Sequence, residues 1–255
     1  MTEKTILVTN DDGIYTDGIY WLWEAVKDFG NVLVVAPDTE KSAVGHAITI
    51  TNPLRTKHVN RRGGFSGYAV NGTPADCVKI AVQSILKSPP DLVVSGINYG
   101  ANVGTNVIYS GTVSAATEGT FLGIPSVAVS IDSHHPEDFK PATDITQNTL
   151  NKVLEFGLPE GTLLNVNVPD IPGAMIKGTR ITTQGNAYFK DRFEKREDPR
   201  GNIYYWMTGE SIDPDSSGNT DNWALKDGYI SVTPIHYKLT NESFMSDLQS
   251  WGFDD

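Results

Sequence analysis

The segment Ile6–Gly13, with the sequence ILVTNDDG, is the most informative stretch of this chain. A run of apolar residues that favour strands ends abruptly in two adjacent carboxylates and a glycine. This order predicts a buried strand that carries Asp11 and Asp12 to the rim of a parallel sheet. Neighbouring carboxylates repel each other, so placing them together costs free energy unless they share a cation. The segment therefore predicts a divalent metal site and, with it, an enzyme.

Outward from this segment, strand-like and helix-like stretches alternate. Continuous apolar strands are expected at residues 31–37, 91–98, 126–132 and 163–168, and helices at residues 17–29, 110–122 and 145–156 and from Thr73 onward. Residues 49–72 are expected to form an extended, exposed ribbon. The alternation predicts βαβ units and an α/β fold in which helices cover both faces of a parallel sheet.

The pattern changes after about residue 170. Residues 189–206 combine charges, a Pro-Arg-Gly turn and three consecutive aromatic residues, which predicts a long hairpin. A strand at residues 229–234 and a short helix at residues 243–251 follow. Exposed aromatic hairpins often contact other subunits, although a solvated hairpin packed on its own domain fits the pattern equally well. We expect residues 1–255 to form one domain with a C-terminal extension.

The composition restricts the class of protein. The 255 residues include 31 acidic and 20 basic side chains, with a net charge of −11. This balance argues against a stable nucleic-acid partner or an anionic membrane surface, and no apolar run is long enough to span a bilayer. The start of the chain lacks the features of a signal peptide, and a single cysteine, Cys77, fits a reducing compartment. We therefore expect a cytoplasmic protein.

Polar clusters follow the carboxyl ends of three predicted strands. Asn10, Asp11 and Asp12 follow the first strand, Ser42 follows the second and Asn98 follows the third. Ligand sites of open α/β sheets form at this edge. Because all of these donors are oxygens, they suit Mg²⁺ or Mn²⁺ better than zinc.

A candidate phosphate site lies nearby in the sequence. Ser110, Gly111 and Thr112 open a predicted helix, where free amides, two hydroxyls and the positive end of the helix dipole favour an anion. Beside a metal site, this helix start predicts the second half of a phosphoryl-transfer centre.

Each candidate also has a purely structural interpretation. Asp12 could cap the following turn, Ser42 could be an ordinary loop hydroxyl, and Asn98 could stabilise a turn. We expect His46 to hydrogen-bond to the backbone, and the histidines at 134–135 to be solvated in a surface loop. Cys77 is expected to be buried in a helix.

The motifs together resemble a known family. The segments TNDDG, APDTEKSAVGHAIT, NGTPADCVKIA, SGINYGANVGTNVIYSGTVSAATEG and GYISVTPI have the order and spacing of the SurE family, from about residue 5 to about residue 237. The resemblance implies a metal-dependent nucleotidase that acts on nucleoside 5′- and 3′-monophosphates. It also implies a Rossmann-like core with a protruding hairpin. Residues from about 185 to 255 would then form an oligomerisation extension that builds a homodimer or tetramer.

The resemblance also implies site residues. One divalent metal ion per subunit, Mg²⁺ or Mn²⁺, would be bound by Asp11, Asp12, Ser42 and Asn98. Ser110, Gly111 and Thr112 would hold the phosphate, with Asn102 as a further candidate. His236 lies near the hinge of the exchanged segment and is expected to be structural. These positions show no departure from the family pattern.

The mechanism expected is hydrolysis by direct attack of water, with Asp11 orienting or deprotonating the water and Asp12 acting mainly as a ligand. A phosphatase that forms an aspartyl phosphate is an alternative, but it needs two aspartates separated by one residue. A non-catalytic nucleotide or metal sensor on the same fold is a second alternative. Dinucleotide binding is disfavoured because NDDG replaces the glycine-rich turn after the first strand.

Overall fold

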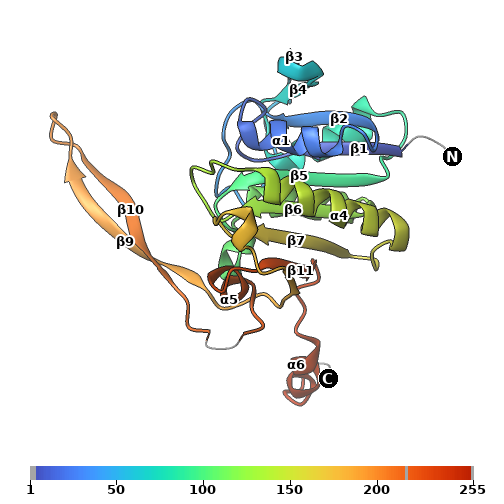
Figure 1. The fold of residues 1–255 in the computed structure, drawn as a ribbon. Helices are drawn as coiled ribbons and strands as arrows, with labels where there is room; N and C mark the ends of the chain where they lie inside the picture. Colours follow the sequence, from blue (N-terminus) through green and yellow to red (C-terminus); the bar gives the residue numbers. More distant parts are fainter. Residues whose placement is uncertain (1–3, 216–217, 254–255) are drawn as a thin grey trace.

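A mostly parallel sheet forms the middle of the molecule in the computed structural model, which describes residues 4–215 and 218–253 (Figure 1). Within these residues the sheet has nine strands in the order β3-β4-β2-β1-β5-β6-β7-β11-β8. Their bounds are β1 (Lys4–Thr9), β2 (Gly30–Pro37), β3 (Thr56–Asn60), β4 (Ser66–Val70), β5 (Leu92–Tyr99), β6 (Ser126–Ile131), β7 (Thr162–Val168), β8 (Thr179–Ile181) and β11 (Ile230–His236). The six neighbouring strands β4, β2, β1, β5, β6 and β7 run parallel. Strand β3 pairs antiparallel with β4, and β11 pairs antiparallel with β7.

Helices cover both faces of this sheet, as predicted. Helices α1 (Asp17–Val26) and α4 (Lys140–Phe156) pack on one face. Helix α1, with Ile19 and Leu22 buried, contacts β1 and β5, and α4, with Leu150 buried, contacts β6 and α1. Helices α2 (Pro74–Ile80) and α3 (Gly111–Phe121) pack on the other face, where Cys77 and Ala115 are buried. The predicted three-layer α/β architecture is therefore confirmed.

The start of α2 shows why the sequence places a helix there. The Thr73 hydroxyl accepts a hydrogen bond from the Asp76 amide at 3.1 Å, and the Asp76 carboxylate accepts one from the Thr73 amide at 2.9 Å. This reciprocal capping box, with Pro74 as the first helical residue, satisfies two otherwise free amides. The predicted helix start and the burial of Cys77 are both confirmed.

Helix α3 lies very close to the sheet because its inner residues are small. A Cβ atom on Gly119 would lie 2.5 Å from the Ser126 hydroxyl and 2.8 Å from a methyl group of Val93. A larger side chain at this position would push the helix away from β5 and β6. The start of α3, which faces the candidate site, is thus fixed by close packing further along the same helix.

Three features differ from the expectations. The predicted ribbon at residues 49–72 is exposed along most of β3, but β4 pairs with β2 and buries Ala69 and Val70. Helix α4 begins five residues before the predicted residue 145, with Pro141 in its first turn, where the missing amide costs no hydrogen bond. Strand β8 and helix α5 (Asp221–Lys226) were not anticipated. They are short, and short segments carry little periodicity.

The C-terminal region contains the predicted hairpin. Strands β9 (Tyr188–Glu197) and β10 (Ile203–Ile212) form a separate two-stranded antiparallel ribbon that projects away from the sheet (Figure 1). It extends beyond the predicted residues 189–206 at its base, where β10 continues to Ile212 and pairs with the start of β9. The predicted terminal helix is α6 (Glu242–Gln249). None of the helices in the described parts of the chain combines the length and apolar character needed to cross a membrane.

Candidate active site

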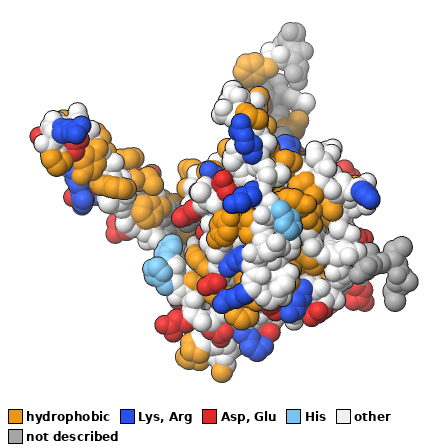
Figure 2. Space-filling view, turned by 90° about the horizontal axis from the view of Figure 1, so that it is seen from above, with side chains coloured by type: hydrophobic (Ala, Val, Ile, Leu, Met, Phe, Trp, Pro, Cys, Tyr) orange, Lys and Arg blue, Asp and Glu red, His pale blue; other side chains and the backbone are white. Residues whose placement is uncertain are grey.

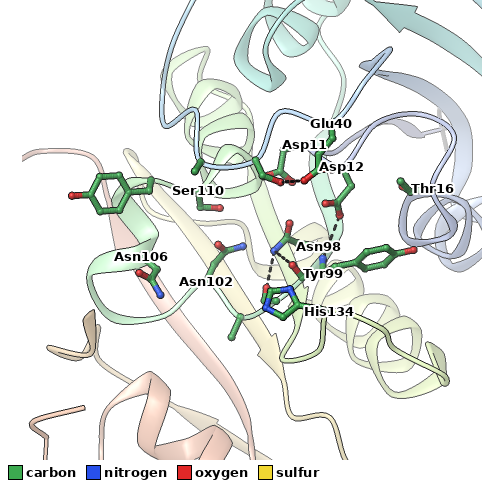
Figure 3. A pocket seen from close by; sticks show the side chains of 15 residues that line it. Asp11, Asp12, Thr16, Glu40, Asn98, Tyr99, Asn102, Asn106, Ser110 and His134 are labelled. Carbon is green, nitrogen blue, oxygen red and sulfur yellow. Dashed lines mark hydrogen bonds between the residues drawn. The ribbon is translucent and has the colours of Figure 1, made fainter. Parts of the chain in front are cut away.

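A cavity of about 600 Å³ opens at the carboxyl ends of β1 and β5, where the strand order changes direction (Figure 3). Six of the eight predicted site residues line this cavity: Asp11, Asp12, Ser42, Asn98, Asn102 and Ser110. Residues that are up to 99 positions apart in the sequence therefore meet in one crevice. Gly111 and Thr112 are not part of the lining.

The turn after β1 presents the two carboxylates. Asn10 braces this turn, because its side chain donates to the Gly13 carbonyl at 3.1 Å and accepts from the Gly13 amide at 3.2 Å. Gly13 has a φ of +102°, which favours glycine. Asp11 is only 4% exposed, and Asp12 is half-buried. The strand thus delivers both carboxylates to the cavity at the cost of burying charge.

A bulge in β5 aims Asn98 at the same place. Ser95 lies opposite Ala128 and Asn98 lies opposite Ser130, so β5 carries one extra residue between these pairs. Gly96 permits the bulge, because its φ is +136° and a Cβ atom would lie 2.3 Å from the Val129 carbonyl oxygen. The Asn98 side-chain amide donates to the Gly100 carbonyl at 2.7 Å, and its Oδ1 is left to face the carboxylate side.

Thr112 lies behind Asp11 instead of in the cavity. Its hydroxyl is fully buried and donates to Asp11 Oδ1, with Asn98 Oδ1 3.4 Å away. A Cβ atom on Gly111 would lie 2.7 Å from that of Asp11, so glycine allows this close approach. In this structure the Thr112 side chain contacts Asp11 and Asn98, and phosphate binding at Thr112 stays a prediction.

Ser110 does face the cavity, and it caps α3. Its Oγ accepts a hydrogen bond from the Val113 amide at 3.1 Å, which leaves the hydroxyl proton free to be donated to a ligand. The positive end of the α3 dipole points in the same direction. Of the three residues predicted at this helix start, Ser110 thus offers the clearest hydrogen-bond donor to an anion.

Ser42 reaches the cavity from the long loop after β2. Its hydroxyl donates to Glu40 Oε1 at 2.7 Å, and the next residue, Ala43, has a φ of +56°. Glu40 is a third carboxylate in the cavity lining (Figure 3). Glu40 was not among the predicted site residues. It lies two residues before Ser42, and both side chains face the cavity.

Asn102 is held by two asparagines of β7. Its backbone amide donates to Asn167 Oδ1 at 2.8 Å, and its carbonyl accepts from the Asn165 side chain at 2.7 Å. The Asn102 side chain donates to Ser130 at 2.8 Å. Asn165 and Asn167 were not predicted. The sequence does show them as two amides that alternate with apolar residues in an otherwise buried strand, a pattern that indicates a polar contact on one face.

Burial raises the pKa of both aspartates, and repulsion from neighbouring carboxylates adds to the rise. Burial raises the pKa of Asp11, although hydrogen bonds from Thr112 oppose this. Burial and then the neighbouring Asp11 charge raise the pKa of Asp12 to about 7, while the Tyr99 amide opposes the rise. Among the described residues no lysine or arginine lines the cavity, so no side-chain cation there compensates the paired charge.

The histidines differ from the expectations in two ways. His134 is exposed, as expected, but it also lines the cavity and lies close to Gly100. His46 does not bind backbone, because its Nε2 pairs with the Glu118 carboxylate at 2.8 Å. Glu118 lies 72 residues away on α3, and no local pattern could have revealed this partner.

Comparison with known proteins places these residues in a family context. A family model described as Survival protein SurE matches residues 6–191. The curated protein named 5′-nucleotidase SurE of Syntrophobacter fumaroxidans is 54% identical over 96% of this chain and 98% of its own length. The protein of the same name from Heliobacterium modesticaldum is 49% identical over 96% of this chain and 91% of its own length.

A solved structure shows the same architecture. The crystal structure of the SurE protein from Aquifex aeolicus superposes with a TM-score of 0.84 at 43% identity, covering 98% of this chain and 100% of that one. The agreement extends over nearly the entire chain in both sequence and fold. This chain therefore belongs to the SurE family.

Proposed function

We propose that this protein is a divalent-metal-dependent phosphomonoesterase that hydrolyses nucleoside 5′-monophosphates, and also 3′-monophosphates, to nucleoside and phosphate. One observation carries the proposal: three carboxylates and the start of α3 face one cavity whose lining, among the described residues, has no lysine or arginine. A phosphate dianion would be repelled from Asp11, Asp12 and Glu40 unless a bound cation reversed the local charge. The names of the relatives support the choice of substrate.

The residues present fit a divalent cation. Asp11 and Asp12 are adjacent, their pKa values are raised by burial, and Asn98 Oδ1 faces the same side. No cluster of three or more His, Cys, Asp or Glu side chains suitable for a metal occurs in the described residues. We propose that the amide oxygen of Asn98 and the hydroxyl of Ser42 join the two aspartates as ligands. Such an all-oxygen set suits one Mg²⁺ or Mn²⁺ ion per subunit.

The protein's own groups divide the remaining work. A divalent cation in the site would supply positive charge to the phosphoryl oxygens and activate the attacking water. The Ser110 hydroxyl and the start of α3 would hold the phosphoryl group on the opposite side, where negative charge develops. Asn102, fixed by Asn165 and Asn167, would border the bound phosphate.

We propose different roles for the two aspartates, each of which has one oxygen held by a protein donor. Asp11 Oδ1 is held by Thr112, and Asp12 Oδ2 accepts from the Tyr99 amide at 3.3 Å. These contacts engage Oδ1 of Asp11 and Oδ2 of Asp12. We assign Asp12 mainly to the cation, and Asp11 both to the cation and to orienting the attacking water.

Assembly through the C-terminal region is part of the proposal. The hairpin exposes Phe193, Tyr205, Trp206 and Met207, and apolar side chains are visible along this projecting arm in Figure 2. Helix α6 and the residues after it expose further aromatic side chains, including Trp251. We propose that these surfaces join subunits into a homodimer or tetramer.

A cytoplasmic location is proposed because the free thiol of Cys77 is buried and forms no disulfide.

The activity is tested with a panel of nucleotides and metals. Purified protein is expected to release phosphate from nucleoside 5′-monophosphates, and more slowly or equally from 3′-monophosphates. A chelator should abolish this release, and added Mg²⁺ or Mn²⁺ should restore it. Release that persists in chelator would contradict the metal requirement. Nucleotide binding without turnover under all metals would instead identify a non-catalytic sensor.

Asparagine substitutions test the division between the aspartates. Asp12→Asn is expected to weaken Mn²⁺ binding by about 100-fold or more, because a charged ligand is lost. Asp11→Asn is expected to lower kcat by about 10²–10⁴-fold at saturating metal, because the water loses its acceptor. Asp144→Asn on the exposed side of α4 is the matched control and should change neither quantity. Unchanged metal affinity in Asp12→Asn would refute the ligand assignment.

The raised pKa of Asp12 predicts a pH dependence of stability without metal. Between its ordinary pKa of 3.8 and the folded-state pKa of about 7, the folded protein binds more protons than the unfolded chain. Stability from this group therefore falls as pH rises through that window. Relative to Asp12→Asn, the metal-free protein should lose on the order of 2 kcal/mol of unfolding free energy between pH 5 and pH 8. Parallel pH curves for the two proteins would contradict this.

Light scattering tests the assembly. The protein is expected to have the mass of two or four chains at micromolar concentration. Trp206→Glu on the hairpin should reduce that mass, because a charge would be buried at the subunit contact. Asn151→Glu on the exposed side of α4 is the control and should leave the mass unchanged. A single-chain mass for the unmodified protein would refute the proposal.

A further inference from the structure

The loop that carries Ser42 is long and irregular. It spans residues 38–55, between the end of β2 and the start of β3, and contains neither helix nor strand. Unstructured loops of this length are uncommon in compact domains unless they serve a function. The contacts that hold this loop therefore decide where the Ser42 hydroxyl lies relative to the carboxylates.

Backbone hydrogen bonds fasten the loop on both sides of Ser42. The Lys41 amide donates to the Asp11 carbonyl at 2.8 Å, which ties the loop to the turn with the two aspartates. The Gly45 amide donates to the Tyr109 carbonyl at 2.9 Å, directly before the Ser110 cap of α3. These two bonds hold the loop against the site at its near end.

The next contact that holds the loop joins the His46 side chain to the buried carboxylate of Glu118. His46 Nε2 lies 2.8 Å from Glu118 Oε2, and Lys79 Nζ lies 2.6 Å from Glu118 Oε1. Glu118 is only 2% exposed, and the His46 ring also stacks on Phe121 with a centroid distance of 5.1 Å. Because an ionised carboxylate only accepts hydrogen bonds, His46 and Lys79 both donate to it.

Glu118 is kept charged by these two donors. Burial acts to raise the pKa of Glu118, but the hydrogen bonds from His46 and Lys79 outweigh it and hold the pKa below its ordinary value. A buried carboxylate that loses its partners is strongly destabilising. The contact between the loop and α3 is therefore a directed charge-assisted bond, in addition to apolar packing.

We propose that His46 and Glu118 are positioning residues for the metal site, which hold the loop along α3 so that Ser42 meets Asp11, Asp12 and Asn98. This inference rests on the proposed function, because it assigns Ser42 to the cation. The loop then follows α3 from its cap at Ser110 to its last residue, Phe121. The same helix thus supports both the phosphate side and the metal side of the site.

The arrangement allows a selective test at His46. In His46→Ala, Lys79 still neutralises Glu118, so the buried carboxylate keeps a partner while the loop loses its bond to α3. In His46→Gln, the side-chain amide can donate from nearly the position of Nε2 and restore the bond. His58→Ala is the matched control, because His58 lies on β3 and contacts Ser66 at 3.0 Å, outside the cavity lining.

Mn²⁺ binding to the metal-free full-length protein is measured by the loss of the free-ion electron paramagnetic resonance signal, and folding is followed by thermal unfolding. His46→Ala is expected to raise the Mn²⁺ Kd about tenfold, in the range typical of groups that orient metal ligands. His46→Gln should recover most of the affinity, and His58→Ala should bind like the unmodified protein. Glu118→Gln provides a second disruption from the helix side.

Asp12→Asn in the same titration separates the two proposals. If Asp12→Asn loses Mn²⁺ binding while His46→Ala stays within twofold of the unmodified Kd, the metal site stands and the positioning role is overturned. The same holds if His46→Ala lowers the unfolding temperature without changing the Kd, since that would be a purely structural role. If Asp12→Asn binds Mn²⁺ normally, the proposed metal site fails, and this inference fails with it.

Discussion

The repulsion between the Asp11 and Asp12 carboxylates is the constraint on which the rest of the site depends. Asp11 is buried and Asp12 half-buried at the end of a central strand. Burial raises the pKa of both, and the Asp11 charge raises that of Asp12 further. No lysine or arginine lines the cavity within the described residues. In the proposed function, a bound divalent cation would offset this repulsion.

The surrounding structure orients these acids without neutralising them. Thr112 donates to Asp11, and the Tyr99 amide donates to Asp12. These donors come from β5 and α3, whose places are fixed by the bulge at Gly96 and by close packing at Gly119. The parallel sheet brings the donors together, because its neighbouring strands end at one edge.

The sequence was most informative where the signal was local. Asp11 and Asp12 are adjacent and end an apolar run, and the Thr73-Pro74 helix start depends on residues three positions apart. The positions of Ser42 and Asn98 followed from strand ends, but the aim of Asn98 depends on a bulge that pairing with β6 creates. Thr112 was predicted only at the phosphate, and its hydrogen bond to Asp11 depends on the packing of α3 against the turn after β1. The His46–Glu118 pair joins residues 72 positions apart, and only the tertiary structure can show such a contact.

The proposed metal site at Asp11 and Asp12 is tested most directly by anomalous X-ray diffraction from crystals of the protein grown with Mn²⁺. A single anomalous peak per subunit is expected within coordination distance of Asp11, Asp12 and Asn98 oxygens, with the Ser42 hydroxyl on the same side. The peak should vanish in crystals of Asp12→Asn. A peak elsewhere, or an ordered protein with both carboxylates intact and no peak at saturating Mn²⁺, would show that the paired aspartates do not form a metal site.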